Sequence, residues 1–381
     1  MSKKALFVAN TGFALLNFRL PLMKFLSDKG WSVVAVANDE ADFAKRFAKE
    51  GIKFINMLID HKGTNPIADM GLIRRLNALY KKEAPTLVHH FTIKPVIFGS
   101  LAAKWAKIPA IVNTITGLGY VFEKGGFMMR IVMELYRLAL SGRPQVIFQH
   151  NDDYRFFISN NIIRETKARV ILGSGVNTEI IHPTMAKKYN GGLRFLFASR
   201  MLWSKGVREY VSAAEKIKEQ FPETSFIMAG GASGGSAKGN PEAIPEKWLY
   251  DVNTIGSVIW MGRIPFEDVM RLLDNSDVFV LPSYYPEGIP RSLIEAAAKG
   301  KAIITTNTPG CREVVIDGTN GFLVPPKDVN SLTNSLLKFI RQPELADQMG
   351  TASRKRAVNI FDEKKILDQT ALVYKEVGVI L

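Results

Sequence analysis

The 381-residue chain contains a single cysteine, Cys311, and five histidines. One cysteine excludes a disulfide framework within the chain and fits a reducing compartment. Long apolar runs are also missing, because no stretch reaches the length that a membrane-spanning helix needs. The basic and apolar start of the chain is too short for a signal peptide, since Asn10-Thr11-Gly12 interrupts it. We therefore expect a protein that is cytoplasmic, either soluble or peripheral to a membrane.

Acidic residues are outnumbered by basic ones, and the net charge is +14. Nucleic acid, an anionic membrane surface or anionic substrates would each fit this charge. A nucleic-acid binder would need a recognisable module or a stripe of basic and aromatic residues. The sequence shows neither, and its basic clusters are scattered at Arg74-Arg75, Lys81-Lys82 and Lys187-Lys188. We expect no nucleic-acid partner. The alternative explanation of the charge is a solvated basic surface that binds no partner.

Short apolar runs alternate with helical segments along the whole chain. The first run is Ala5–Ala9, and a second cycle opens at Leu193–Ala198. Such alternation predicts parallel, doubly wound α/β domains, and the length favours two of them. Pro183 and Gly191-Gly192 mark the break between the two blocks. We predict an N-terminal domain over residues 1–185, a C-terminal domain over residues 190–361 and a final helix over residues 362–381.

Glycine-rich phosphate loops of the common kinds are absent. The first strand runs into Asn10-Thr11-Gly12 rather than Gly-x-Gly-x-x-Gly, which argues against a dinucleotide-dependent oxidoreductase. The stretch from Gly230 to Pro245 is rich in Gly, Ser and Ala but has no Lys-Ser or Lys-Thr in phosphate-loop position. We expect this stretch to be a flexible surface loop.

One stretch near residue 290 has the pattern of a strand, a helix and a second strand. The strands are Val278–Ser283 and Ala302–Thr306, and Pro290 is expected as the first helical residue with Gly300 closing the helix. Ligands of such units bind beyond the carboxyl ends of the strands. Free N–H groups at the helix start would favour a phosphate there.

Two carboxylates flank this turn, namely Glu287 in the loop and Glu295 in the helix. Carboxylates are poor phosphate ligands but good acceptors for sugar hydroxyl groups. A diphosphate site beside such acceptors describes a nucleotide sugar. The alternative is a solvated Glu in a turn followed by a Glu on a helix surface.

The spacing of Glu287 and Glu295-Ala296 resembles the signature of family 4 retaining glycosyltransferases. The resemblance is specific over Asp277–Pro325, covers nearly the full chain and is weakest over Ala232–Val258. It implies the GT-B fold, in which two Rossmann-like doubly wound domains face a cleft. In that family the final helix returns to the first domain.

The resemblance also implies the donor site. Arg200 and Lys205 follow the strand that ends at Ala198, and match the pair that binds the diphosphate in the family. Because the chain lacks an Asp-x-Asp triplet, we expect these cations to replace a metal ion. We expect neither metal nor cofactor, with a UDP-sugar as co-substrate. The predicted catalytic residues are Glu287, Arg200, Lys205 and His89; the predicted donor-binding residues are Gly12, Arg200, Lys205, Arg263, Ile264, Glu287, Gly288, Ile289, Pro290 and Glu295.

The acceptor side is predicted in the first domain. His89 and His90 end a strand, and a metal pair is disfavoured because consecutive strand residues face opposite ways. The loops Phe91–Pro95 and Thr116–Tyr120 resemble those of transferases that extend polyprenyl-diphosphate-linked sugars. The predicted acceptor-binding residues are Asn17, Arg19, His90, Lys94 and Thr116.

No side chain stands out as a covalent nucleophile. By resemblance, the leaving β-phosphate takes the acceptor proton, and the sugar keeps its anomeric configuration. The nearest subgroup adds N-acetylgalactosamine or a related hexose to an undecaprenyl-diphosphate-linked sugar during polysaccharide or glycan assembly. The alternatives are a UDP-sugar epimerase of the same fold and a glycosyltransferase with an acceptor that is not lipid-linked.

Residues Phe127–Leu140 are apolar on most faces but include Arg130 and Arg137. Either this helix is wholly buried in the core, or part of it lies in a membrane interface with the arginines near headgroups. The second possibility predicts a peripheral protein at the inner face of the cell membrane.

Overall fold

The computed structural model describes residues 3–39, 41–60, 65–119, 122, 125–184, 192–232 and 240–381. Lys187-Lys188, Tyr120 and residues 233–239 of the predicted surface loop lie outside the described residues. The chain divides into two compact units, each built on a parallel sheet. Unit 1 comprises Met1–Ser174, Pro286–Gly288 and Glu363–Leu381, and unit 2 comprises Gly175–Tyr285 and Ile289–Asp362. The predicted fold class of two Rossmann-like domains is confirmed.

The sheet of unit 1 has seven strands in the order β3-β2-β1-β4-β5-β6-β7, and every neighbouring pair is parallel. Its strands are near-continuous apolar runs, as expected where helices cover both faces. In the central strand, Phe7 pairs with Ala35 on one side and with His89 on the other. The strands are β1 (Lys4–Thr11), β2 (Ser32–Asn38), β3 (Lys53–Asn56), β4 (Leu87–Phe91), β5 (Ala110–Ile115), β6 (Gln145–Phe148) and β7 (Ala168–Val170).

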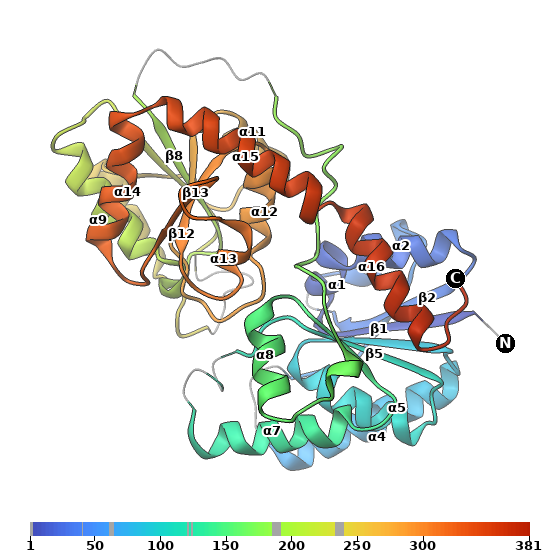
Figure 1. Ribbon diagram of the computed structural model, residues 1–381. Helices are drawn as coiled ribbons and strands as arrows, with labels where there is room; N and C mark the ends of the chain where they lie inside the picture. The colour runs from blue at the N-terminus through green and yellow to red at the C-terminus, as the bar shows by residue number, and fades with distance from the viewer. Residues whose placement is uncertain are drawn as a thin grey trace. The chain divides into compact units, whose positions relative to one another are not determined.

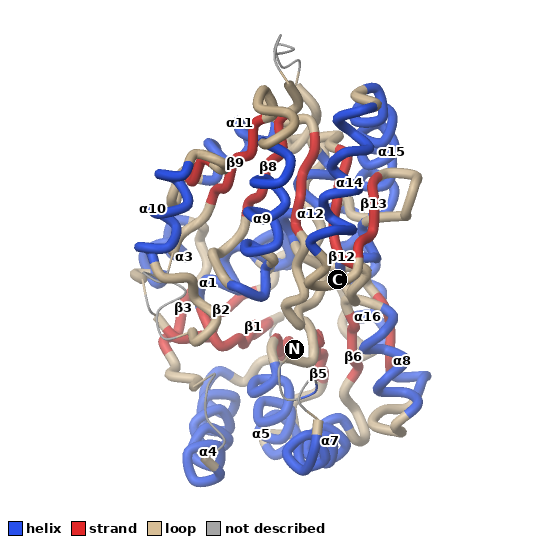
Figure 2. Tube along the Cα trace, turned by 90° about the vertical axis from the view of Figure 1, so that its left-hand side faces the viewer, coloured by secondary structure: helices blue, strands red, loops and turns tan. Residues whose placement is uncertain are grey.

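Helices cover both faces of this sheet and form two separate apolar cores. Figure 2 shows α4, α5 and α7 side by side, and with α8 they supply one core. The other core is formed with α1, α2, α3 and α16. The helices are α1 (Gly12–Phe18), α2 (Leu20–Asp28), α3 (Phe43–Lys49), α4 (Pro66–Glu83), η1 (Pro95–Gly99), α5 (Ser100–Trp105), α7 (Gly126–Leu140), α8 (Asn151–Ser159), η2 (Glu165–Lys167) and α16 (Glu363–Glu376).

The C-terminal helix α16 packs on unit 1, although it follows unit 2 in sequence. In Figure 1 it lies beside α2, and its residues Ile366, Val373 and Tyr374 are buried in the core with Phe7. The hydroxyl of Tyr374 lies 2.7 Å from Nδ1 of His89. The last helix is therefore fixed by both apolar burial and a buried polar contact.

The helix α7 is only partly buried. Met133, Tyr136, Ala139 and Leu140 face the core, whereas Phe127 is 78% exposed and Leu138 is 59% exposed. The alternative of a wholly buried helix is therefore wrong. In the described part of the chain, no helix has both the length and the apolar character needed to cross a membrane.

The sheet of unit 2 has six parallel strands in the order β10-β9-β8-β11-β12-β13. Val278 of the central strand pairs with Phe195 on one side and with Ala302 on the other. The strands are β8 (Arg194–Ala198), β9 (Ser225–Ala229), β10 (Ile259–Trp260), β11 (Val278–Leu281), β12 (Ala302–Thr306) and β13 (Gly321–Val324).

The helices of unit 2 pack in pairs, α9 against α14 and α12 against α15. Gly350 of α15 permits close packing on the turn after α12, because a Cβ atom at this position would lie 2.2 Å from the carbonyl oxygen of Gly300. The helices are η3 (Trp203–Lys205), α9 (Val207–Lys218), α10 (Glu246–Ile255), α11 (Phe266–Asp274), α12 (Arg291–Ala298), α13 (Cys311–Val314), α14 (Val329–Arg341) and α15 (Glu344–Ile360).

Candidate active site

The predicted donor residues of unit 2 gather at one edge of its sheet. All its strands are parallel, so the loops that follow them leave from the same edge. Arg200 follows β8, Arg263 and Ile264 follow β10, and the loop after β11 leads into α12. This edge is where α/β sheets of this kind bind ligands.

Arg200 and Lys205 are brought together by the ring of Tyr285. The guanidinium carbon of Arg200 lies 5.4 Å from the ring centroid, and the ammonium nitrogen of Lys205 lies 5.0 Å from it. Both distances are within the range of a cation–π interaction. Lys205 is 4% exposed, so its ammonium group is largely removed from water. Sequence reasoning missed Tyr285, whose only signal is its position directly before Pro286 and the donor loop.

The backbone fixes this arrangement. Gly206 has a φ of +82°, and a Cβ atom there would lie 2.3 Å from the carbonyl oxygen of Pro282. Only glycine fits such a left-handed position at such a close approach. The N–H of Tyr284 donates to the carbonyl oxygen of Ser204 at 2.8 Å. Lys205 and Tyr285 therefore belong to two loops that are fastened to each other.

The helix α12 begins at Arg291, one residue later than the sequence pattern predicts. Pro290 is instead the residue before the helix, in an extended conformation, and no described side chain caps the helix start. This correction leaves the first-turn N–H groups at the carboxyl edge, where they favour an anion. Gly300 follows the helix with a φ of +68°, as predicted for a glycine that ends a helix.

Glu295 is buried in α12 and paired with Arg291. Its side chain accepts a hydrogen bond from Nε of Arg291 at 2.9 Å, and the residue is 8% exposed. Burial raises the pKa of Glu295, and the charge and hydrogen bond of Arg291 oppose that shift. Arg291 was not among the predicted site residues, although its position four residues before Glu295 is the usual signal of a helical ion pair.

Arg263 lines a cavity of about 350 Å³ beside β9 and β10. Trp260, Tyr250 and Gly231 contribute to the same cavity. Nε1 of Trp260 donates to the carbonyl oxygen of Gly230 at 3.0 Å, which fixes the indole at the cavity wall. Ile264 follows Arg263 and is half-buried. An aromatic wall with one guanidinium can take a planar, polar ligand group such as a base.

The predicted donor loop is divided between the units. Glu287 and Gly288 are grouped with unit 1, whereas Ile289, Pro290 and Glu295 belong to unit 2. Glu287 is half-buried, and Gly288, Ile289 and Pro290 are buried. The two glutamates therefore belong to different units.

In unit 1, Gly12, Asn17 and Arg19 lie in or beside α1, which follows β1. A Cβ atom on Gly12 would lie 2.5 Å from the ring of Phe43, so close packing of α1 accounts for this glycine. Asn17 donates from Nδ2 to the carbonyl oxygen of Phe13 at 2.9 Å. The guanidinium carbon of Arg19 lies 4.6 Å from the ring centroid of Phe91. Arg19 thus sits at the end of β4, near the predicted acceptor loop.

His89 and His90 are buried in the sheet, and both nitrogens of each ring have partners. His89 contacts the hydroxyls of Tyr374 at 2.7 Å and Thr114 at 2.8 Å. His90 contacts Oδ1 of Asn113 and the hydroxyl of Tyr80, each at 2.9 Å. These surroundings argue against the predicted roles of His89 in catalysis and of His90 in acceptor binding.

Burial also keeps both histidines uncharged. It holds the pKa of His89 well below its usual range, and the charge of Arg19 acts in the same direction. Burial lowers the pKa of His90 to about 4, although its hydrogen bond with Asn113 opposes the shift. Neutral rings that bridge strands and helices stabilise the fold of unit 1 rather than face a ligand.

The loop after β4 contains the predicted acceptor residue Lys94. Its ammonium nitrogen lies 2.7 Å from a carboxylate oxygen of Asp69, and both side chains are largely buried. Thr92 has a φ of +68°, which is unusual for a β-branched residue and marks strain in this loop. Thr116 follows β5 at the same edge and is half-buried. Sequence reasoning did not single out Thr92, because backbone strain leaves no mark in composition.

Across the described residues, no cluster of three or more His, Cys, Asp or Glu side chains is arranged to hold a metal ion. Several cations lie at or near the carboxyl edge of the sheet of unit 2, among them Arg200, Lys205, Arg263 and Arg291.

Two family models match the chain. One describes "Glycosyl transferase 4-like" proteins and matches residues 4–151. The other describes "Glycosyl transferases group 1" and matches residues 182–356. The first match lies in unit 1, and the second covers most of unit 2 together with Pro286–Gly288 of unit 1.

Among curated proteins, the chain is 28% identical to the N,N'-diacetylbacillosaminyl-diphospho-undecaprenol alpha-1,3-N-acetylgalactosaminyltransferase of Campylobacter jejuni. That match covers 97% of this chain and 98% of the relative. The chain is also 29% identical to a UDP-Gal:alpha-D-GlcNAc-diphosphoundecaprenol alpha-1,3-galactosyltransferase of Escherichia coli, over 82% of this chain and 81% of the relative.

Solved structures share the fold. A glycosyltransferase from Rickettsia africae superposes with a TM-score of 0.78 at 22% identity, covering 99% of each chain. Anabaena HepE in complex with UDP superposes with a TM-score of 0.79 at 19% identity, covering 98% of this chain and 100% of that one. With two matched family models and this fold, the chain belongs to the GT-B glycosyltransferases of the glycosyl transferase 4-like and group 1 families.

Proposed function

We propose that this glycosyltransferase moves a hexose or N-acetylhexosamine from a UDP-sugar to an undecaprenyl-diphosphate-linked sugar, with retention of anomeric configuration. The observation that carries the donor part is the pairing of Arg200 and Lys205 around Tyr285 at the carboxyl edge of unit 2. Two cations held at one ring suit a diphosphate, whose charge grows as the glycosidic bond breaks. The relatives' names, which include undecaprenol diphosphates and a UDP-sugar, support the substrate classes.

In this proposal each donor residue has a distinct task. Lys205 and Arg200 neutralise the leaving diphosphate together with the N–H groups at the start of α12. Glu295 accepts hydrogen bonds from the ribose hydroxyls, and Arg291 keeps its carboxylate oriented and charged. Glu287 accepts hydrogen bonds from the donor sugar. The cavity beside Trp260 and Arg263 offers room for the uracil base.

The transfer step needs no protein nucleophile. The bond between the anomeric carbon and the β-phosphate oxygen breaks, and a bond from the acceptor hydroxyl oxygen forms on the same face of the sugar. The acceptor proton passes to an oxygen of the leaving phosphate. Such a step requires positioning and charge stabilisation above all. Fixed cations supply the stabilisation, so we propose that the reaction is independent of metal.

The donor assignment is tested by thermal unfolding with a panel of nucleotides and nucleotide sugars. A ligand at a hundred times its dissociation constant adds about 2.7 kcal/mol to the free energy of unfolding. UDP and UDP-sugars should stabilise the protein, whereas GDP and CMP counterparts should not. Equal stabilisation by all nucleotides would remove the support for a UDP-sugar donor.

A UDP-sugar epimerase of the same fold is the second candidate function. It would convert and hydrolyse UDP-sugar without an acceptor. Incubation with UDP-sugar alone, followed by analysis of the sugar released, separates the two activities. A glycosyltransferase should consume UDP-sugar only when the acceptor is present. A glycosyltransferase with an acceptor free of lipid would instead act equally on the soluble saccharide.

We further propose that α7 attaches the protein to an anionic membrane surface where the lipid-linked acceptor is found. Phe127, Ile131 and Leu138 are exposed and spaced so that they share one face of the helix. Arg130 lies beside that face and can reach headgroups, whereas Arg137, also beside it, is held by Glu134 and by the carbonyl oxygen of Asn160. The net charge of +14 acts in the same direction.

Sedimentation with vesicles tests this attachment. Binding should require anionic lipid, weaken with salt and be lost in a Phe127→Asp/Leu138→Asp variant. The matched control is Ile180→Asp/Ile255→Asp, which places the same charge at exposed apolar residues of unit 2. If both double variants sediment alike, α7 is not the attachment site.

A further inference from the structure

A cavity lies in unit 1, at the edge of its sheet opposite to the predicted acceptor loops. It measures about 520 Å³ and lies between the ends of α7 and α8 and the turn η2. The strand β6 begins shortly after α7 ends, so the cavity lies at the amino ends of the strands. Neither the donor site nor the predicted acceptor residues contribute to it. Its size is within the range of small-molecule sites.

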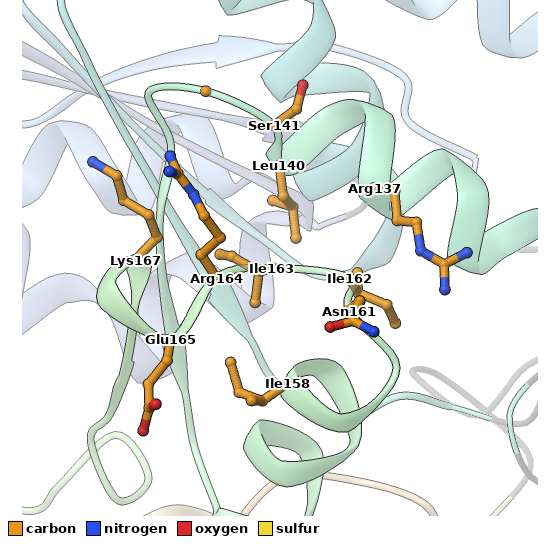
Figure 3. Close-up of a pocket in the computed structure, with 11 residues that line it drawn as sticks. Arg137, Leu140, Ser141, Ile158, Asn161, Ile162, Ile163, Arg164, Glu165 and Lys167 are labelled. Carbon is orange, nitrogen blue, oxygen red and sulfur yellow. The ribbon is translucent and has the colours of Figure 1, made fainter.

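One part of the lining of this cavity is apolar, and its rim is mainly basic. Leu140, Ile158, Ile162 and Ile163 form the apolar part, and Ser141 and Asn161 add polar groups to the lining. In Figure 3 the apolar side chains lie between Arg164 and Lys167 on one side and Arg137 on the other.

The cations at the rim differ in how they are held. Arg137 is occupied by the carboxylate of Glu134 and by the carbonyl oxygen of Asn160, to which it donates at 2.7 Å. Within the described part of the chain, no hydrogen bond or ion pair engages the side chain of Arg164 or Lys167. The carboxylate of Glu165, also at the rim, accepts a hydrogen bond from the hydroxyl of Tyr154 at 3.0 Å. The rim therefore offers unpaired positive charge.

We infer that this cavity binds the headgroup of an anionic phospholipid. Arg164 and Lys167 contact the phosphate, and the isoleucines with Leu140 contact the glycerol and the first carbons of the acyl chains. A charged phosphate and an adjoining apolar segment match a rim of cations and an aliphatic wall. A free phosphate would use only the rim.

The surroundings of the cavity favour a lipid as the source of this phosphate. Leu138 precedes the cavity residue Leu140 on α7 and is 59% exposed. It continues the exposed apolar face that includes Phe127 and Ile131. The cavity thus lies at the C-terminal end of an apolar helix face that is open to solvent, where acyl chains can continue.

The test uses the full chain without nucleotide sugar or acceptor, so its result is independent of the proposed enzymatic function. The probes are dihexanoyl-phosphatidylglycerol below its critical micelle concentration, dihexanoyl-phosphatidylcholine and inorganic phosphate, each titrated by calorimetry. We expect saturable binding of phosphatidylglycerol and at least about tenfold weaker binding of the other two. Inorganic phosphate lacks the apolar segment, and the quaternary ammonium of phosphatidylcholine cancels the charge of its phosphate and is repelled by the cations at the rim. Equal affinity for inorganic phosphate would show a free-anion site and overturn the lipid assignment.

Two variants then locate the bound lipid. Arg164→Glu/Lys167→Glu should weaken phosphatidylglycerol binding at least about tenfold through loss of charge-assisted contacts. Ile158→Trp keeps every charge but fills the cavity. This variant should weaken phosphatidylglycerol binding to a similar extent. The matched control Lys81→Glu/Lys82→Glu makes the same charge change at exposed residues at the end of α4. Unchanged binding in the first two variants, or equal loss in the control, would overturn the inference.

Discussion

The ammonium nitrogen of Lys205 lies 5.0 Å from the ring centroid of Tyr285, and the side chain of Lys205 is almost wholly buried. The same ring faces Arg200, whose guanidinium carbon is 5.4 Å from its centroid. A buried lysine whose position is fixed by an aromatic ring loses little freedom when an anion arrives. This preorganisation is what stabilisation of a leaving group requires.

Replacing Lys205 should therefore reduce turnover more than it reduces folding stability. We expect Lys205→Ala to cost about 2.7–4 kcal/mol of transition-state stabilisation, the range for loss of one preorganised donor. The measurement is kcat/KM for transfer, with thermal unfolding as the check on folding. Lys247→Ala removes an exposed lysine of unit 2 and should leave kcat/KM unchanged. Near-normal turnover of Lys205→Ala would exclude this residue from the site.

The close approach of Gly206 to Pro282 should make Gly206→Ala more destabilising than its left-handed backbone conformation alone would. Gly206→Ala combines a left-handed backbone with a Cβ atom 2.3 Å from a carbonyl oxygen, whereas Gly256→Ala has a similar φ of +81° and no atom within 4 Å. Gly256→Ala should cost about 1 kcal/mol of unfolding free energy, and Gly206→Ala should cost more and also lower turnover. Urea unfolding and kcat/KM measure the two effects. Equal losses in both variants would mean that the close approach has no energetic role.

Replacing Glu295 should mainly weaken the binding of the nucleotide. Glu295→Gln keeps the size of the side chain but removes the charge that accepts hydrogen bonds, so we expect UDP to bind about 10- to 100-fold more weakly. Calorimetric titration with UDP measures this change. Glu215→Gln, at an exposed position of α9, is the control. If UDP affinity stays within about twofold of the original, the ribose assignment of Glu295 is wrong.

His90 should make the stability of unit 1 depend on pH. Its folded-state pKa of about 4 lies below the value of 6.5 for an unfolded histidine, so between these values the unfolded chain binds more protons. The contribution of His90 to the free energy of unfolding is complete above about pH 6.5. As the pH falls toward about 4, about 3 kcal/mol of this contribution is lost. Urea unfolding at several pH values should show this fall. His90→Gln should remove the part that His90 contributes, whereas the buried His89, whose pKa is also lowered, should keep the remaining part. The control is the exposed His182, whose replacement by Asn should leave the slope unchanged.

Sequence patterns were sufficient for the fold because both sheets are parallel and buried on both faces. Their strands are continuous apolar runs, and a turn such as Glu287–Pro290 must then follow the carboxyl end of a strand. The sequence also indicated the cations Arg200 and Lys205, through their place after β8 and through the family resemblance.

What the sequence did not predict depends on contacts between distant residues. Tyr285 faces Lys205 only because Gly206 allows two loops to meet. His89 was predicted to be catalytic, yet its ring is held by Tyr374 from the other end of the chain. A strand-end histidine looks the same in sequence whether it faces a ligand or a buried hydroxyl.

The most direct measurement of the central claim is the stereochemistry of transfer in the absence of divalent metal. The protein is incubated with a UDP-sugar and a synthetic undecaprenyl-diphosphate-linked saccharide in excess EDTA, and the anomeric configuration of the new linkage is determined by NMR. Our account predicts transfer that persists in EDTA and a product with the same anomeric configuration as the donor. An inverted product, or activity that EDTA abolishes and Mg²⁺ or Mn²⁺ restores, would contradict it.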